Sequence, residues 1–504
     1  MRIPFPIYIP LLKAAGFAAL LFLVEIYQGT APAFAICAFI FIVIATLTFN
    51  LAGGLSRPSG AYVFFYSILA VILGLVWKAI LGEPADTNLA QPNLTMEVYV
   101  GSIAAMWIAV AVSRKLALKR PLLGNLVTPA NMQNAAVGCM VTGITMAVAL
   151  QTVEVQQGSA LSALSQINRF LPLALILGII YEIRRTGGRR SVSWIVLISG
   201  GAIFCQGLLG FSKEAIFTPF ACWLIAAGSQ GYRFSKAQIF SLVIGILLMG
   251  HYLVPYAQYG RNFVEPTFAG RVRTSVDLLS DLEDTRTKYE SSSADYYDRR
   301  IQGYFDTSQG LMDRLQMISP DDVLHDLTEK RGPIGSFPII MEFENLIPHF
   351  LWPSKPAVNF GNFYAHEMGG LADDDVTTGV SFSPSGEAFH VARWMGIFFW
   401  APLVWILLFT LFDSLCGDTR VSPWGLLMCA YFAHIAPEAG LAGAIYMMGP
   451  ITVGLVVAAF ASAYVMPLIG TLFKGPSQVT VHRGIPVRGV PRRARTLPQP
   501  GIGQ

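Results

Sequence analysis

Apolar residues in this chain are gathered into long stretches that recur from the N-terminus almost to the C-terminus. A helix that crosses a bilayer needs roughly 20 predominantly apolar residues, and twelve stretches approach that length. They cover residues 11–27, 32–49, 60–81, 96–112, 131–150, 170–183, 192–209, 215–227, 237–255, 394–412, 422–435 and 449–472. Because these stretches are continuous instead of alternating in polarity, they favour helices over the strands of a membrane barrel. The pattern predicts an all-α polytopic membrane protein with about 12 transmembrane helices.

One long polar interval, residues 258–393, separates the ninth stretch from the tenth. It contains two short amphipathic helical patterns, at 274–289 and 319–330, and the second opens with a Ser-Pro-Asp-Asp helix-start signal. We expect both helices to lie on the membrane as a lid or frame. From Pro348 to Trp394, aromatic, proline, glycine and ionisable residues follow one another without a period of 2 or 3.6. This irregular segment is therefore expected to carry a functional site.

Composition supports the membrane class. Of 504 residues, 54% are hydrophobic and only 13% are charged, and the mean hydropathy is +0.53, whereas soluble domains carry about 25% charged residues. The six cysteines lie in or beside apolar stretches without a CxxC spacing, so neither a disulfide framework nor a metal site is expected. No phosphate-cradling glycine loop appears, which argues against a nucleotide-activated donor, and no cofactor or nucleic-acid partner is expected.

Charge is distributed unequally along the chain, and the distribution predicts its orientation. Residues 258–393 hold 12 Lys and Arg against 21 Asp and Glu, while the remainder holds 23 against 10. Basic residues accumulate in alternate short loops, as in cytoplasmic loops of membrane proteins. We expect both termini in the cytoplasm and the acidic loop on the outer side of the membrane. The expected parts are a bundle of about nine helices (1–257), the large outer loop (258–393), about three further helices (394–473) and a basic disordered cytoplasmic tail (474–504).

Candidate acid–base groups occur where the loop enters the tenth stretch. Ser383-Pro384 is a helix-start signal, and Glu387 and His390, three residues apart, then share one helix face. Such a pair can orient or tune a proton-transfer group, and it can equally be a structural salt bridge. His366 and Glu438 are further candidates for the same role. The run Asp373–Asp375 lacks the spacing of a calcium loop and is interpreted as a solvated acidic turn.

Cationic residues occur at the ends of the stretches expected to face the outer side of the membrane. Lys213 stands with Glu214 in a tight turn, Arg169 begins the sixth stretch, and Arg261 follows the ninth. Each of them alone has an ordinary explanation, since a basic residue at a span end commonly extends its charge to lipid headgroups. Lys213 and Glu214 can also simply neutralise each other.

The chain resembles the O-antigen polymerase and ligase class of bacterial envelope glycosyltransferases, and within it the exopolysaccharide repeat-unit polymerases. The resemblance lies in about a dozen spans, one large late outer loop and several short motifs. These motifs are Gly210-Phe-Ser-Lys-Glu214, Pro348-His-Phe-Leu-Trp-Pro-Ser-Lys-Pro356, Asn359, Gly361-Asn362, Thr377-Thr378-Gly379 and Ser385-Gly-Glu-Ala-Phe389. The chain departs from that family in the outer turn, where Lys213 and Glu214 stand in place of a frequent Arg.

The resemblance implies a metal-independent membrane glycosyltransferase of the GT-C-like kind. It also implies a bacterial inner membrane, with the large loop 258–393 in the periplasm. Its donor would be a polyprenyl-pyrophosphate-linked oligosaccharide, and the growing polysaccharide, the lipid bilayer, and flippase and chain-length regulator proteins would be its partners. The leaving pyrophosphate needs preorganised cations, for which Lys213, Arg169, Arg261 and Lys355 are the candidates. The acceptor hydroxyl needs a general base, for which Glu387, His390, His366 and Glu438 compete. Aromatic rings that can stack on sugars are Trp352, Phe363, Tyr364 and Phe389.

Other functions remain open at this stage. A ligase would transfer the finished glycan to a different acceptor. A flippase or polysaccharide exporter would need a charged cavity inside the bundle rather than the outer loop. A non-catalytic scaffold of an export complex would need neither. The sugars, the linkage and the oligomeric state do not follow from the sequence.

Overall fold

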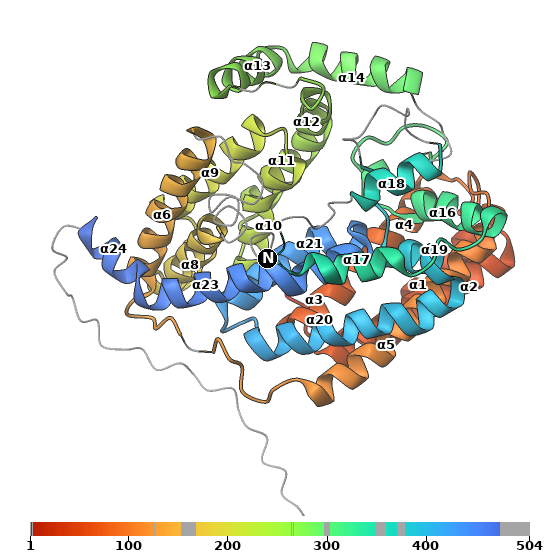
Figure 1. Ribbon diagram of the computed structural model, residues 1–504, viewed down its shortest axis with the longest axis horizontal. Helices are drawn as coiled ribbons and strands as arrows, with labels where there is room; N and C mark the ends of the chain where they lie inside the picture. The colour runs from red at the N-terminus through yellow and green to blue at the C-terminus, as the bar shows by residue number, and fades with distance from the viewer. Residues whose placement is uncertain are drawn as a thin grey trace, which may run out of the picture.

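The structure is a computed structural model that describes residues 2, 4–124, 126–152, 168–263, 265, 267–296, 303–347, 352, 359–369 and 379–473 (Figure 1). Within these residues the regular structure is helical, and the remaining pairings are two isolated bridges, Arg2 with Arg233 and Phe382 with Ala439. The prediction of an all-α protein is therefore confirmed for the described residues.

Every apolar stretch forms helix. Seven helical segments of the described chain are long and apolar enough to cross a membrane: Pro32–Ser56, Pro58–Leu81, Pro92–Leu116, Met132–Leu150, Lys236–Gly260, Pro384–Cys416 and Gly440–Tyr464. The five other stretches form helices of 16 or 17 residues, namely α1 (Leu11–Tyr27), α8 (Phe170–Arg185), α9 (Trp194–Leu209), α10 (Lys213–Ser229) and α21 (Pro423–Glu438).

The seven longer segments are composed of the following elements. They are α2 (Pro32–Ala52) with η1 (Gly54–Ser56); α3 (Pro58–Phe65), η2 (Tyr66–Ile72) and α4 (Leu73–Leu81); α5 (Pro92–Leu116); α6 (Met132–Thr152); α11 (Lys236–Leu248), η3 (Met249–Leu253) and α12 (Val254–Gly260); α19 (Pro384–Met395), η5 (Gly396–Trp400) and α20 (Ala401–Cys416); and α22 (Gly440–Tyr446), η6 (Met447–Ile451) and α23 (Thr452–Tyr464). The short helix α24 (Met466–Leu472) follows. Four of the segments contain a π-helical turn, at η2, η3, η5 and η6, a feature that is frequent at functional sites.

The helices pack in two groups joined by α21. In the first, α2 packs against α1 and α5, and α20 against α5; in the second, α6 packs against α8 and α24, and α9 against α8 and α10. Figure 1 shows α6, α8 and α9 on one side of the molecule and α1, α2 and α5 on the other. Helix α21 contacts α3 in the first group and α8 and α10 in the second. Residues at the end of α21 are therefore positioned between the groups.

The polar interval between α12 and α19 forms short helices, of which α13 and α14 lie at the top of the view and α17 near its middle (Figure 1). They are α13 (Phe268–Ser280), α14 (Leu282–Tyr296), η4 (Met312–Arg314), α16 (Ile318–Arg331), α17 (Phe337–Asn345) and α18 (Phe360–Glu367). Helix α14 packs against α12, α17 packs against α22, and α16 packs against α5 and α19. The expected helix at 319–330 is thus present as α16. Its side chains are largely buried among the other helices, whereas a helix lying on the membrane as a lid was expected.

Candidate functional site

The turn before α10 is held in a conformation that an ordinary residue rarely adopts. Phe211 has a φ of +48°, in the left-handed region that is costly for a residue with a side chain. Its ring packs on Gly260, where an added Cβ would lie 2.1 Å from the ring, and its carbonyl accepts a hydrogen bond of 3.1 Å from Nε of Arg261. The Ser212 hydroxyl then caps α10 by accepting from the amide of Ala215 at 3.3 Å. The turn therefore brings the start of α10 next to the end of α12.

Three cations meet at this turn, and we name Lys213, Arg261 and Arg314 the cationic cluster. Burial and the nearby charges of Arg314 and Arg261 together lower the pKa of Lys213 to about 8, and the Glu438 carboxylate opposes them. Lys213 and Arg261 were expected at the outer ends of spans, whereas Arg314, which comes from η4 in the polar interval, was not among the candidates from the sequence. Mutual repulsion between cations is costly, so their convergence favours a bound anion.

The end of α21 supplies the acid–base groups beside the cluster. Nδ1 of His434 is hydrogen-bonded to the Glu438 carboxylate, and its Nε2 lies 3.5 Å from a carboxylate oxygen of Glu214. Burial opposes ionisation of Glu438, but the hydrogen bond to His434 and the charges of Lys213 and Arg314 outweigh it and lower its pKa. Glu438 is therefore ionised at neutral pH and sits next to Lys213, and Glu214 pairs with His434 rather than neutralising Lys213 alone.

Arg169, at the N-cap of α8, joins the same region through an aromatic contact. Its guanidinium carbon lies 5.2 Å from the ring centroid of Tyr431, one turn before His434 on α21. Its buried Nε has no hydrogen-bond partner in the part of the chain that the structure describes. A buried donor without a partner carries a desolvation cost, which an anionic oxygen at this position would relieve.

Glu387 lies on α19 as predicted, but its carboxylate is already fully engaged. Helix α19 begins at Pro384 with the Ser383 hydroxyl as its cap, which confirms the helix-start prediction. Glu387 is 2% exposed; one oxygen accepts from the amides of Leu441 and Ala442, and the other accepts from the Tyr364 hydroxyl at 3.1 Å. It therefore neutralises the N-terminus of α22, a role that holds an anion in place, and both of its oxygens already accept hydrogen bonds from the protein.

His390, one turn further along α19, forms a proton-sharing pair with Glu367. Nδ1 of His390 lies 2.8 Å from the Thr328 hydroxyl, which donates its own hydrogen to the carbonyl of Leu324 at 2.7 Å. We infer that Nδ1 carries a proton, so the 3.0 Å contact between Nε2 and the Glu367 carboxylate needs a second one. The Glu367 side chain is 31% exposed. The sequence analysis selected the adjacent His366, whereas the structure pairs His390 with Glu367.

Two carboxylates that the sequence analysis treated only as a helix start are central to the packing of α16. Asp321 accepts hydrogen bonds from the Tyr99 hydroxyl at 2.6 Å and from the amide and hydroxyl of Ser383. Asp322 accepts from the amides of Ala90 and Gln91 at 2.6 and 2.9 Å and thereby fixes the segment that leads into α5. These bonds explain why a helix with a polar sequence is buried instead of resting on the membrane surface.

The remaining predicted residues are distributed as follows. Tyr364 and Phe389 are 2% and 1% exposed and pack among protein side chains, so neither presents a free ring face for a sugar. Phe363 and Trp352 are partly exposed. Lys355 and the run Asp373–Asp375 lie outside the described residues. Within the described ranges, no group of three or more His, Cys, Asp and Glu side chains is arranged to hold a metal ion.

Comparison of the chain with protein-family models, with curated proteins and with solved structures finds no match. The most coherent arrangement is the cationic cluster with the His434–Glu438 pair, where residues from four separate segments meet, α10, the end of α12, η4 and α21.

Proposed function

We propose that this protein polymerises lipid-linked oligosaccharide repeat units into a surface polysaccharide at the outer leaflet of a bacterial inner membrane. The observation that carries the proposal is the convergence of Lys213, Arg261 and Arg314 beside the ionised Glu438. Clustered cations suit a pyrophosphate group, and an adjacent carboxylate suits an acceptor hydroxyl. The resemblance to exopolysaccharide polymerases gives the same donor class.

The topology belongs to the same proposal. We assign all twelve apolar helices to the membrane, with both termini in the cytoplasm and residues 258–393 in the periplasm. The distribution of basic loops supports this orientation. In it, the starts of α8 and α10 and the ends of α12 and α21 all lie at the outer headgroup level, where a lipid-linked pyrophosphate is found.

In the proposed reaction, a hydroxyl oxygen of the acceptor glycan attacks the anomeric carbon of the donor sugar. The bond from that carbon to the pyrophosphate oxygen breaks, and the leaving group departs with the electron pair. The cationic cluster stabilises the negative charge that develops on this oxygen. Glu438 accepts the hydroxyl proton, and His434 holds the carboxylate in position. Pyrophosphate is a good leaving group, so these steps need no metal.

A chain-lengthening assay on purified protein with a lipid-linked oligosaccharide tests the proposal. We expect wild type to produce a ladder of products, and Lys213→Ala and Glu438→Gln to lower the rate by about 10²–10³-fold, the loss typical of removing one group that stabilises transition-state charge. Lys330→Ala is the matched control, because its side chain is 69% exposed and forms only a surface ion pair with Asp326. The control should retain full rate.

The alternatives predict different products. A ligase would transfer the glycan only when a different acceptor is supplied and would make no ladder from donor alone. A flippase would move the lipid-linked unit across vesicles without lengthening it. Either result with wild-type protein would overturn the polymerase proposal. Full-length polymer from both Lys213→Ala and Glu438→Gln would overturn the assignment of these residues to the active site.

A further inference from the structure

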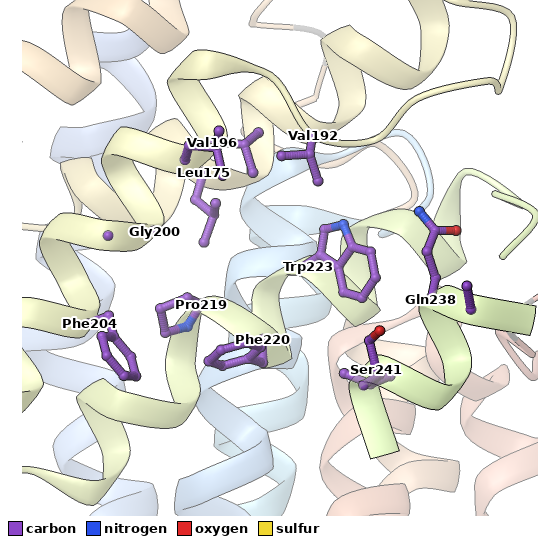
Figure 2. A pocket seen from close by; sticks show the side chains of 14 residues that line it. Leu175, Val192, Val196, Gly200, Phe204, Pro219, Phe220, Trp223, Gln238 and Ser241 are labelled. Atoms are coloured by element: carbon purple, nitrogen blue, oxygen red, sulfur yellow. The ribbon is translucent and has the colours of Figure 1, made fainter. Parts of the chain in front are cut away.

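An open cavity of about 620 Å³ lies between α8, α9, α10 and α11 (Figure 2). Phe204 and Pro219 line one end of it, and Trp223 and Gln238 line the other (Figure 2). The indole of Trp223 is fixed by a 3.1 Å hydrogen bond from Nε1 to the Ser191 hydroxyl and by an edge contact with Phe234. The wall of the cavity is therefore held in place.

Among the described residues, the lining of the cavity is apolar apart from Gln238 and Ser241, at the start of α11, and the Trp223 indole N–H, which is bonded to Ser191. Two glycines of α9 leave the space open. A Cβ at Gly201 would meet nothing within 4 Å, and one at Gly200 would make only ordinary contacts at 3.7 Å with Leu175 and Pro219. A cavity of this chemistry suits a hydrocarbon chain and offers nothing to a sugar or an ion.

Helix α10 connects the cavity to the cationic cluster. Lys213 is its first residue, and Pro219 and Trp223 lie six and ten residues further along. At 1.5 Å per residue these positions are about 9 and 15 Å below Lys213 along the helix axis. The apolar cavity would thus begin about two helical turns below an anionic headgroup held by the cluster.

We propose that this cavity binds the isoprenoid chain of the lipid-linked donor while the cationic cluster holds its pyrophosphate. This inference rests on the proposed function for the identity of the lipid. Charge complementarity at the head and apolar complementarity along the tail are supplied by the same helix, so a single amphiphile satisfies both. The open side of the cavity allows the chain to enter laterally from the bilayer.

Photolabelling tests the occupant directly. The probe is a long-chain isoprenyl pyrophosphate that carries a diazirine in its tail, added to the full-length protein in detergent and in vesicles. We expect the crosslinked peptides to come from α9 and α10. Gly201→Phe, which projects a ring into the cavity, should lower this labelling by about tenfold or more. Excluding only two buried methylene groups already lowers the binding affinity about tenfold.

Gly245→Phe is the matched control, because Gly245 lies on α11 outside the cavity lining and also has open space around its Cβ. It should label as wild type does. A phosphatidylglycerol probe with the same diazirine provides the comparison of lipid class. Equal labelling of the cavity by this phospholipid, crosslinks at other helices, or unchanged labelling of Gly201→Phe would each overturn the proposal.

Rate measurements separate this proposal from the proposed function. With a long-chain donor, Gly201→Phe should raise KM with little change in kcat, and with a short-chain donor it should behave as wild type. If wild type makes no polymer but the isoprenoid labels α9 and α10, the catalytic proposal fails and the binding site stands. If wild type makes polymer and the cavity is not labelled, the reverse holds.

Discussion

At the residue scale, burial and neighbouring charge decide what each ionisable group can do. Lys213 is half-buried and lies near other cations, so its amine binds a proton more weakly than the amine of an exposed lysine does. Glu387 and Glu438 are both glutamates near helix ends. Glu387 accepts hydrogen bonds from three donors, whereas Glu438 keeps a partly exposed position beside Lys213. Two residues of the same type therefore differ in role because of their partners.

The pKa of Lys213 predicts a pH dependence of anion binding. Because this pKa is about 8 in the free protein, the ammonium is lost as the pH rises through 8, and affinity for inorganic pyrophosphate should fall over that range. A bound anion favours the charged form, so above pH 8 binding should take up a proton. Calorimetric titration from pH 6.5 to about 9.5 measures both effects.

Lys213→Arg provides the control for this titration, since arginine stays charged throughout the range. The ligand's own ionisation affects both proteins equally, so the difference between the two profiles belongs to Lys213. Parallel profiles would show that Lys213 does not contact the anion.

At the scale of elements, the break between α21 and α22 positions the residues beside the cationic cluster. Helix α21 ends at Glu438, and Gly440 adopts a φ of +64° before α22 continues. The amide of Gly440 donates to the Phe382 carbonyl at 3.0 Å, and an added Cβ would lie 2.2 Å from Glu387. Glu387 thus connects α19 to the start of α22 and, through that break, fixes the position of Glu438.

This arrangement predicts a structural rather than a chemical phenotype for Glu387→Gln. A glutamine amide cannot accept from all three donors, so the free energy of unfolding should fall by about 1–3 kcal/mol, seen as a lower Tm in detergent. Chain-lengthening rate per folded molecule should be largely retained. Glu329→Gln, which removes a surface pair with Arg393 at 3.4 Å, should change Tm little. An unchanged Tm with loss of polymer would instead support the catalytic role that the sequence suggested.

At the scale of the whole molecule, the polar interval is part of the bundle rather than a separate lid. Helix α16 packs against α5 and α19, and Arg314 extends from η4 into the cationic cluster. The site consequently draws on residues separated by more than two hundred positions along the chain. Its assembly depends on the proposed topology, because all of these segments must meet at one face of the membrane.

The topology is tested by cysteine labelling in intact cells. In a Cys205→Ser background, which removes the exposed native thiol, a cysteine at Lys330 should react with a membrane-impermeant maleimide. A cysteine at Arg189 should react only after permeabilisation. Both positions are exposed in the structure, so a failure to react reports the membrane side rather than burial. The reverse labelling pattern would contradict the proposed orientation and place the cationic cluster at the cytoplasmic face.

Much of the architecture followed from the sequence because helix formation in apolar stretches is a local property. The twelve stretches all form helix, seven of them in segments long enough to cross a membrane, and the helix start at Ser383 was readable from its capping chemistry. The importance of Lys213, Arg169, Arg261 and Glu438 as a group was only a hypothesis, since each had an ordinary explanation alone.

What the sequence by itself determined was the all-α membrane class and the residue types at the helix ends, because hydropathy, propensity and capping act over a few neighbouring residues. The tertiary structure decided the partners. In the folded chain, Asp321 and Asp322 are buried and Glu387 accepts from the amides of α22. His390 pairs with Glu367, and Arg314 lies near Lys213. Hydrogen bonds and charge interactions of this kind join residues that are distant in sequence, and no local pattern specifies them.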